Sequence, residues 1–510
     1  MAAVAIAPVA AAPAAAAPQA HSSGHVRSAA APLLMPKNTS QNLFVKFGRF
    51  GARVFRSSER EYKTAQQVQP AEVESVQCFN NASSAEQCCF RACSHRGRCS
   101  RGVCLCEAPW HGLDCAHNHH AKDTITRLEE AEGPVTRAVG WSGFLYVHSP
   151  PPELGLQNAR KYQRHTTTYD TEFHLVRRLL SDRQARTLWR DAASLFLVPT
   201  WAMQTWGNTG GFRTNVFSIN RLSRWVRRTH GEAHWDNGSR FLFGFFGDKG
   251  ACNLREKGFS GDKGKLGNFG VLVHWGLRVP WSRQMQDDAD EWRPGAGGEP
   301  CTQAETDLVL PVYRRWTAAT AANHSARRRG FLSRRNTQGE SEWNWEFFFA
   351  GSQQHSHVPH YSQGVRKAVA THHHNRSRYL IVQRVWLDRH WLTSRFCLAP
   401  SGDGFGDRLS QSMMMGCVPV IIQPAVFQPF EGLLPYDAFS MRFGYHDIPV
   451  LHELLRNVSD AEHARLLRGV EKYAPAFNWH DVDGRAYEFV RYELCRRARD
   501  ALCDHLRPLL

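Results

Sequence analysis

The sequence predicts an α/β protein with two lobes, each built on a parallel β-sheet, preceded by a small disulfide-rich module. Three observations lead to this prediction. From about residue 140 the chain alternates apolar, strand-like runs with amphipathic helical stretches. A polar, arginine-rich stretch at 314–341 divides this alternation into two series. Upstream of both, 8 of the 14 cysteines lie between Cys78 and Cys115.

Nine apolar runs are the expected strands of the two sheets. In the first series they are FLYV (144–147), LFLVP (195–199), RFLFGFF (240–246), FGVLVHW (269–275) and DLVLPVY (307–313). In the second they are EFFFAG (346–351), YLIVQRVW (379–386), RFCLAP (395–400) and VPVII (418–422). Strands buried on both faces of a sheet have such nearly continuous apolar runs. We therefore expect a low-complexity segment at 1–75, a disulfide module at 76–117, a linker at 118–140, a first lobe at 141–340 and a second lobe at 341–510.

Composition restricts the class of partner. The chain has 510 residues and a formal charge of +16, which favours an acidic partner such as a nucleotide diphosphate, an anionic polysaccharide, a membrane surface or a nucleic acid. Its arginines are scattered and no nucleic-acid-binding motif accompanies them, so we expect no nucleic acid partner. The Ala/Pro-rich first 36 residues contain too many prolines for a membrane-spanning helix.

The clustered cysteines indicate disulfides rather than a zinc site, because the CxxC pairs that zinc favours are absent. Their spacing, Cys93-x5-Cys99-x4-Cys104-x-Cys106-x5-Gly-x2-Cys115, resembles the epidermal-growth-factor-like (EGF-like) module. The resemblance implies that Cys106 pairs with Cys115, Cys93 with Cys104, and Cys99 with Cys88 or Cys89. Disulfides indicate an oxidising compartment, and six Asn-x-Ser/Thr sequons agree with it, at Asn38, Asn81, Asn237, Asn323, Asn375 and Asn457.

Two further cysteines lie near the C-terminus. Cys495 and Cys503 are part of YELCRRARDALCDHL, which reads as one helix. A rise of about 12 Å over eight helical residues exceeds disulfide reach, so we expect them not to pair.

A glycine-rich bend, SGDGFGD (401–407), follows the strand RFCLAP in the second lobe. Open parallel sheets bind ligands at the carboxyl ends of their strands. Glycines let the backbone approach a ligand closely, and a helix that begins near Gly406 would direct free amide groups towards phosphate oxygens. Arg408 falls in its first turns, with Gln411 on the same face. The helix should end at Gly416, a favoured left-handed cap. The bend therefore predicts an anion site.

The string from Phe396 to Ile422 resembles the exostosin family of glycosyltransferases, whose second lobe carries a similar FC-x-x-P-x-G, Arg-x-x-Glu and G-C-V-P-V-I-I series. Further matches, among them FLYVHSPPPELG, GDKGAC, LVHWG, LVLPVY, FFFAGS and YSQGVRKAV, extend the resemblance over about 141–490. It implies two Rossmann-like lobes of the GT-B architecture, an inverting nucleotide-sugar-dependent glycosyltransferase and residence in the Golgi lumen. It also allows a dimer with an identical or related chain.

The same resemblance implies site residues. A UDP-sugar donor would place its diphosphate on Ser401, Gly402, Gly404 and Arg408, and an acceptor glycan would attack the anomeric carbon from the opposite face. Arg408 and the helix amides can stabilise the departing UDP, so no metal is required, although a divalent cation (Mn or Mg) could assist. Gln411 stands where the family has Glu. A Glu carboxylate has two acceptor oxygens, whereas the Gln side chain has one acceptor oxygen and one donor group.

A catalytic base should lie on the first lobe, and the sequence offers Asp248 and His274, each directly after an apolar strand. A turn-capping Asp and a core His bonded to the backbone are the alternative interpretations. The family's Gly-Arg-Asp-His stretch is NGSRF here, with Ser239 and Arg240 near the position of the Asp and His.

Three hypotheses about function follow. The first is an active glycosyltransferase. The second is a catalytically silent nucleotide- or glycan-binding protein, suggested by Gln411 and NGSRF. The third is an extracellular interaction protein that acts through the disulfide module, for which deletion of 76–117 would leave nucleotide binding unchanged.

Overall fold

A computed structural model describes thirteen stretches of the chain, namely 89–100, 103–118, 143–151, 154, 168–203, 211–252, 268–281, 300–314, 343–354, 361–383, 387–480, 483–499 and 503–508. The predicted low-complexity segment 1–75, Cys88 and nearly all of the predicted linker 118–140 lie outside them, as do three of the six sequons, at Asn38, Asn81 and Asn323.

The first sheet has five parallel strands in sequential order, which confirms the five predicted runs. They are β5 (Leu145–Val147), β6 (Leu195–Val198), β7 (Phe241–Gly244), β8 (Gly270–Val273) and β10 (Leu308–Val309). Phe196 is paired with Phe241, and Phe243 with Val271. Every residue of these strands except Tyr146 is buried, as the nearly continuous apolar runs predict.

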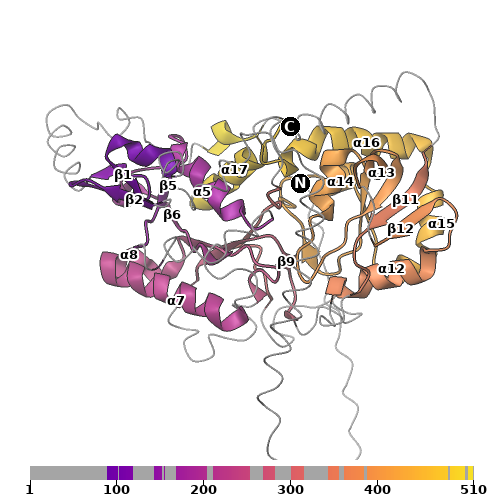
Figure 1. Cartoon of the computed structure of the whole chain (residues 1–510), viewed down its shortest axis with the longest axis horizontal. Helices are drawn as coiled ribbons and strands as arrows, with labels where there is room; N and C mark the ends of the chain where they lie inside the picture. Colours follow the sequence, from indigo (N-terminus) through magenta and orange to yellow (C-terminus); the bar gives the residue numbers. More distant parts are fainter. Residues whose placement is uncertain are drawn as a thin grey trace, which may run out of the picture. The chain divides into compact units, whose positions relative to one another are not determined.

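Helices connect and cover this sheet (Figure 1). They are α5 (Thr171–Ser181), η7 (Arg190–Ala192), α7 (Gly211–His230), α8 (Glu232–Trp235) and η8 (Asp236–Gly238). Helix α5 is amphipathic: Leu175, Val176, Leu179 and Leu180 are buried in the core cluster that also holds Leu145 and Val147 of β5.

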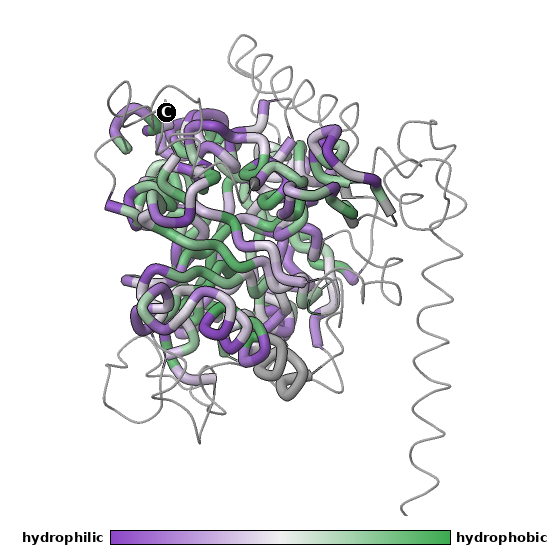
Figure 2. The backbone as a smooth tube through the Cα atoms, turned by 90° about the vertical axis from the view of Figure 1, so that its left-hand side faces the viewer, coloured by the Kyte–Doolittle hydropathy of each residue, from purple (hydrophilic) through white to green (hydrophobic). Residues whose placement is uncertain are grey.

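The second sheet also has five parallel strands, but its strand order is β12-β11-β13-β14-β16. The strands are β11 (Trp345–Ala350), β12 (Tyr379–Val382), β13 (Ser394–Leu398), β14 (Val418–Ile421) and β16 (Met441–Arg442). Figure 2, which views the molecule from the side of the first lobe, shows hydrophobic strands inside and hydrophilic helical turns outside. The four predicted runs are confirmed, and β16 was not predicted, because a two-residue edge strand is too short to show a period.

The helices of the second lobe pack on both sides of its sheet (Figure 1). They are η11 (Tyr361–Gly364), α12 (Val365–His373), α13 (Leu387–Leu392), α14 (Arg408–Met415), η12 (Tyr436–Ala438), η13 (Tyr445–Val450), α15 (Leu451–Arg456), α16 (Asp460–Tyr473) and η14 (Ala474–Phe477). Helix α14 ends at Gly416 with φ 80°, as predicted.

The C-terminal segment differs from the prediction. Helix α17 (Ala486–Ala498) packs on β5 and β6 of the first lobe and is followed by η15 (Cys503–Leu506). Cys495 and Cys503 form a disulfide with a Cα–Cα distance of 5.4 Å, so the prediction that they do not pair was wrong. The predicted single helix instead ends at Arg499, whose left-handed φ of 53° turns the chain and removes the axial rise between the two cysteines.

A short antiparallel pair joins the lobes. Strand β9 (Gly276–Leu277) of the first lobe pairs with β15 (Val426–Phe427) of the second. Leu277, Val426 and the disulfide Cys252–Cys301 share one small apolar cluster there. The resulting contact is specific, because strand pairing fixes a register.

The disulfide module consists of η3 (Phe90–His95), β1 (Gly97–Ser100), β2 (Val103–Cys106), β3 (Trp110–His111) and β4 (His117–Asn118). Its disulfides are Cys93–Cys104, Cys106–Cys115 and Cys89–Cys99. These include the two pairs that the EGF-like resemblance implies, and Cys89 is the partner of Cys99.

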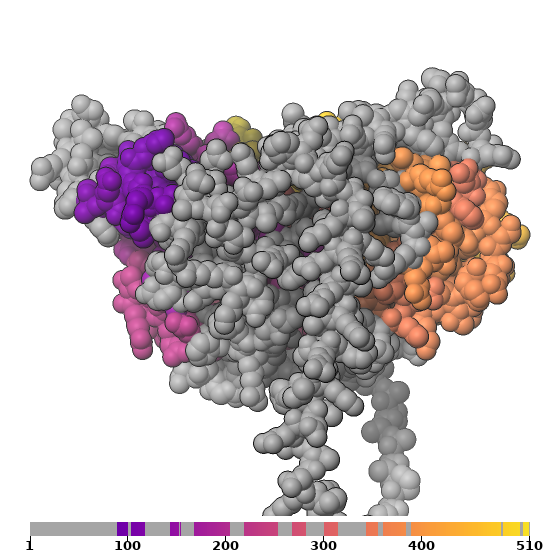
Figure 3. All heavy atoms as spheres, in the orientation of Figure 1, coloured from indigo at the N-terminus to yellow at the C-terminus, as the bar shows by residue number. Residues whose placement is uncertain are grey.

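The module is docked on the first lobe. Arg186 Nη1 and Nη2 donate to the two carboxylate oxygens of Asp114 at 2.7 and 2.9 Å, and both side chains are fully buried. Phe90 packs against Phe173 and Trp201 of the lobe. Figure 3 shows the indigo module against magenta residues of this lobe. The module therefore shares a core with the lobe.

Within the described part of the chain, we find no helix whose length and apolar content would let it span a bilayer.

Candidate functional site

The strand order of the second sheet locates its ligand crevice. From β11 the chain passes to β12 on one side, and from β12 it crosses over to β13 on the other side of β11. In open α/β sheets the crevice lies at such a switch point, outside the carboxyl ends of the two central strands. Here those ends are Ala350 and Leu398, followed by Gly351 and by the glycine-rich loop 401–407.

The loop folds back on itself and touches the first lobe. Gly402 N donates to the carbonyls of Gly404 and Phe405 at 3.0 and 3.1 Å, and Phe405 N donates to the carbonyl of Asp248 at 3.0 Å. Gly404 has φ 153°, and a β-carbon there would lie 1.8 Å from the same Asp248 oxygen. Glycine at 404 is therefore required for the close approach of the two lobes.

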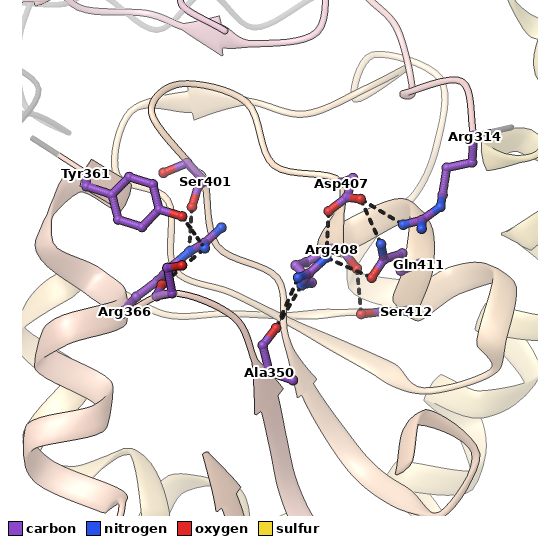
Figure 4. Close-up of polar contacts among 10 residues, drawn as sticks. Arg314, Ala350, Tyr361, Arg366, Ser401, Asp407, Arg408, Gln411 and Ser412 are labelled. Atoms are coloured by element: carbon purple, nitrogen blue, oxygen red, sulfur yellow. Dashed lines mark hydrogen bonds and ion pairs between the residues drawn. The ribbon is translucent and has the colours of Figure 1, made fainter. Parts of the chain in front are cut away.

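Arg408 begins helix α14 beside the end of β11 (Figure 4). Its Nε and Nη2 donate to the carbonyl of Ala350 at 3.2 and 3.0 Å, and Nη1 donates to Asp407 and Gln411 at 2.8 and 2.9 Å. Gln411 Nε2 donates to Asp407 Oδ2 at 2.7 Å. Arg408 and Gln411 thus lie together, as their spacing predicts, and Asp407 joins them.

A second arginine, which the sequence interpretation did not single out, lies across the crevice. Arg366 is in the first turn of α12, is 6% exposed, and its Nε donates to the carbonyl of Ser401 at 2.9 Å. Its Nη1 donates to Tyr361 Oη at 2.7 Å. Burial lowers the pKa of Arg366 to about 10. Among the described residues no carboxylate lies within ion-pair distance of this guanidinium.

Gly351 marks the space between the two arginines. A β-carbon at this position would lie 3.4 Å from Arg366 Nη1 and 3.5 Å from Arg408 Nη2. Figure 4 shows the two guanidinium groups on either side of the region above the strand that carries Ala350. The same reasoning that selected Arg408, a cation in the first turn of a helix that follows a strand, would have selected Arg366 in YSQGVRKAV.

Asp407 is the carboxylate of this site. Burial raises the pKa of its carboxyl, but the charges of Arg408, Arg314 and Arg366 outweigh burial and hold the pKa below its usual range. Arg314, from the end of the first lobe, pairs with Asp407 Oδ2 at 2.7 Å. Three guanidinium groups and one carboxylate leave a net charge of about +2, which matches a diphosphate.

Asp248, one of the two predicted bases, lies against the loop. It follows β7, and its Oδ1 accepts a hydrogen bond from Tyr169 Oη at 2.6 Å. Burial and the neighbouring carboxylate raise the pKa of Tyr169, so the phenol keeps its proton. The structure therefore places a carboxylate with a phenol partner beside the predicted donor loop.

His274, the other predicted base, is buried and bonded on both sides. Nδ1 donates to the carbonyl of Leu310 at 3.0 Å, and Nε2 accepts from Thr171 Oγ1 at 2.9 Å. Burial lowers the pKa of His274 to about 4. This geometry favours the core-histidine interpretation for His274.

A buried carboxyl that sequence reasoning did not identify lies at the carboxyl end of β6. Glu172 accepts hydrogen bonds from the backbone N–H groups of Thr200 and Trp201 at 2.7 and 2.9 Å. Burial raises its pKa to about 8 despite these bonds. Because both oxygens are engaged by backbone, Glu172 positions this segment of the first lobe.

The NGSRF stretch lies away from the crevice. Ser239 and Arg240 precede β7, at its amino end, whereas Asp248 follows its carboxyl end. A strand of four residues separates the two ends by about 13 Å. The difference from the family at NGSRF therefore does not alter the predicted donor loop.

Within the described residues, one group of cysteine, histidine or acidic side chains is close enough to share a metal ion, Cys89, Cys93 and Cys104, and all three are in disulfides. Asp403, a carboxylate within the loop 401–407, lies 3.9 Å from Lys249 Nζ.

Comparison with known proteins assigns the family. The Exostosin GT47 domain matches residues 143–458. This chain belongs to the exostosin GT47 family. The match confirms the resemblance read from the sequence, and with it two parallel α/β sheets in the arrangement of the GT-B fold. The matched residues include most of both lobes, Asp248 and the glycine-rich loop 401–407.

Relatives carry glycosyltransferase names. The chain is similar to a probable glycosyltransferase of Arabidopsis thaliana, at 35% identity over 80 residues, 16% of this chain and 17% of that protein. It is similar to a probable glucuronoxylan glucuronosyltransferase of Arabidopsis thaliana, at 24% identity over 347 residues, 64% and 66% of the two chains. A probable beta-1,4-xylosyltransferase of the same plant is 29% identical over 118 residues, 22% and 28%.

The chain spans 17% of the length of the probable glycosyltransferase named first, and 15% of a second probable glycosyltransferase of Arabidopsis thaliana. The GT47 domain therefore carries the family assignment.

Proposed function

We propose that this GT47 chain transfers a sugar from a UDP-sugar to a polysaccharide or glycoprotein glycan, with inversion at the anomeric carbon. The observation that carries the proposal is the pair of guanidinium groups, Arg366 and Arg408, on both sides of Gly351 at the switch point of the second sheet. A diphosphate above Gly351 would be within reach of both. Relatives named as glucuronosyl and xylosyl transferases support a nucleotide-sugar donor.

The residues of the site account for stabilisation of the leaving group. As the bond between the sugar and UDP breaks, negative charge grows on the diphosphate. Arg366 and Arg408 are held by the carbonyls of Ser401 and Ala350, so they are positioned before the reaction and need little reorganisation. The net charge of about +2 makes a metal ion unnecessary for this step, and a divalent cation would act as an additional clamp.

The acceptor hydroxyl would attack from the first lobe. Asp248 lies at the loop and can accept a proton, whereas both ring nitrogens of His274 are engaged. We assign Asp248 as the base and Tyr169 as the residue that positions its carboxylate. Attack from this side displaces UDP from the opposite face, which inverts the anomeric carbon.

The compartment follows from the disulfides. Six disulfides join described cysteines, and such bonds persist in oxidising compartments. The three described sequons, at Asn237, Asn375 and Asn457, have exposed asparagines that could carry glycans. Both features support the lumen of the secretory pathway, and the family resemblance favours the Golgi.

The test is UDP release by the full chain, purified with its disulfides, with a panel of UDP-sugars, a plant oligosaccharide pool as acceptor, and with and without divalent metal. Arg408→Ala and Arg366→Gln each remove a charge-assisted hydrogen bond to phosphate, so we expect UDP affinity to fall about tenfold or more in each. Asp248→Asn should abolish transfer and leave UDP binding unchanged.

Arg465→Ala is the matched control, because Arg465 is an exposed arginine of the same lobe, paired with Glu462. Melting temperatures of all variants separate lost binding from lost folding. If the wild type binds UDP without transferring a sugar, and the Arg408 variant no longer binds UDP, the chain is a silent nucleotide-binding protein. UDP binding that is equal in the wild type and both arginine variants would refute the assigned site.

A further inference from the structure

A large cavity lies at the amino ends of the strands of the first sheet, whereas Asp248 follows the carboxyl end of β7. Its volume is about 1090 Å³, and it is lined by residues at or before the amino ends of four strands, including Leu195, Arg240, Gly270 and Asp307. The end of α17 and Phe427 also line it. Small-molecule pockets reach about 1,000 Å³, so the space suits a ligand of several sugar units better than a single small ion.

Four arginines and four acidic residues line the cavity, and some of them are in ion pairs. Glu493 pairs with Arg496 at 3.0 Å, and Asp191 pairs with Arg190, which does not line the cavity. Three lining arginines, Arg240, Arg497 and Arg499, have no carboxylate within ion-pair distance among the described residues. The other two lining acids are Glu305 and Asp307, and the Asp307 carboxylate accepts backbone hydrogen bonds. When Arg190 is counted with its partner Asp191, the lining and this neighbour together carry about one net positive charge.

Two of these arginines also keep an unused donor. The Nε atoms of Arg240 and Arg497 are buried and have no hydrogen-bond acceptor among the described residues. The guanidinium of Arg240 lies 5.0 Å above the ring of Phe196, and that of Arg497 is held by backbone carbonyls, among them Glu305 at 3.1 Å. A buried donor without an acceptor is unfavourable, so an anion that lets the guanidinium reorient would be favourable here.

The remaining lining selects the chemistry of the ligand. The carboxylate of Glu305 and the hydroxyls of Ser239 and Thr306 can bond to sugar hydroxyls, and Phe427 offers a half-buried aromatic ring. The two acids would repel a diphosphate, whereas one net positive charge matches a single carboxylate. The arrangement therefore favours an oligosaccharide that carries uronic acid units.

We propose that this cavity, which we call the basal cavity, is a second carbohydrate site that binds an acidic glycan, with a uronate carboxylate on Arg240 and Arg499. The site is separate from the donor crevice, because Arg240 precedes β7 and Asp248 follows it. A glycan bound there does not compete with UDP, and its binding does not depend on transfer.

Calorimetric titration of the full chain with hexagalacturonate, at physiological salt and with and without UDP, tests the proposal. We expect saturable binding that UDP does not displace. Arg240→Gln and Arg499→Asn, of which the second keeps a residue that tolerates left-handed backbone, should each weaken binding about tenfold and leave UDP affinity unchanged. The methyl-esterified hexamer and a neutral xylan hexamer should bind at least tenfold more weakly than the acid.

Arg224→Gln, which removes an exposed arginine from α7, is the matched control and should leave binding unchanged. Equal losses in Arg224→Gln and Arg240→Gln would indicate nonspecific charge attraction and overturn the proposal. Displacement by UDP would place the glycan in the donor crevice, and equal binding of acid and ester would exclude recognition of the carboxylate. Retained UDP affinity in the Arg240 and Arg499 variants would show that these variants fold. If the wild type binds UDP but not hexagalacturonate, the proposal for the basal cavity is refuted and the donor site is not.

Discussion

The side-chain amide of Gln411 bonds to both members of an ion pair. Its oxygen accepts from Arg408 and its nitrogen donates to Asp407, and the side chain is 4% exposed. The family pattern has Glu at this position. In this chain a Glu would place two carboxylates at hydrogen-bond distance, so Gln is the residue that fits beside Asp407. The change at 411 is thus explained by its neighbour four residues earlier.

We predict that Gln411→Glu destabilises the folded state by about 1–3 kcal/mol, because the new carboxylate faces Asp407 and loses the hydrogen bond between them. Denaturant unfolding at pH 7 measures this change. Combining it with Asp407→Asn should recover most of the loss, since one donor and one carboxylate are then restored in exchanged positions. A single Gln411→Glu variant as stable as the wild type would contradict the proposed role of Asp407.

At the scale of elements, apolar runs predicted the longer strands but not the two-residue strands. All nine predicted runs contain strands, because central parallel strands are buried on both faces. The two-residue strands β9 and β15 were not predicted, since they exist only where the two lobes meet. The end of α17 was missed for a similar reason: nothing in the local sequence shows that Arg499 adopts a left-handed conformation.

A histidine cluster joins three elements of the first lobe. His148 follows β5, His230 ends α7, and His234 lies in α8, with His148 Nε2 3.4 Å from His234 Nε2. Burial lowers the pKa of His230 and of His234 to about 4, and lowers the pKa of His148 well below its usual value. All three are therefore neutral in the folded state at pH 7.

We predict that the free energy of unfolding decreases as the pH falls from about 6.5 towards 4, because the unfolded chain then binds protons that the folded cluster excludes. The cluster's contribution to this decrease between pH 7 and 5 should be about 2–4 kcal/mol, because solvent reaches His230 and His234 and reduces their contributions below that of the fully buried His148. Thermal unfolding across this range measures it. His148→Phe keeps an aromatic ring without a titrating group, so its pH dependence should be shallower; identical slopes for variant and wild type would exclude the cluster as a source.

At the scale of the whole molecule, the disulfide module is part of the first lobe's core. The Asp114–Arg186 pair is fully buried, and Arg91 donates to the same carboxylate at 3.1 Å. The hypothesis that the module is a separate interaction unit predicted that its deletion leaves nucleotide binding unchanged. Deletion would instead remove the carboxylate that compensates the charge of Arg186 and uncover Phe173 and Trp201.

We predict that Asp114→Asn lowers the free energy of unfolding by about 3–5 kcal/mol, because it leaves a buried guanidinium charge uncompensated. Denaturant unfolding provides the measurement. The double replacement Asp114→Leu with Arg186→Met should cost less than the single change. Asp191→Asn is the control, since its exposed pair with Arg190 should contribute less than about 1 kcal/mol. A cost of Asp114→Asn no larger than this control would show that docking does not depend on the pair.

The sequence alone determined the fold class, the nine predicted strands, the family and the glycine-rich bend at 401–407. Burial on both faces of a sheet and glycine in a tight bend are local requirements that a chain must show in its own residues. Tertiary structure decided which distant groups meet. It brings Arg366 to Arg408, Arg314 to Asp407, Asp248 to Gly404 and Asp114 to Arg186. The members of each pair are about 40 to 160 residues apart in the sequence. Their contacts arise from strand order and lobe packing, which no local pattern encodes.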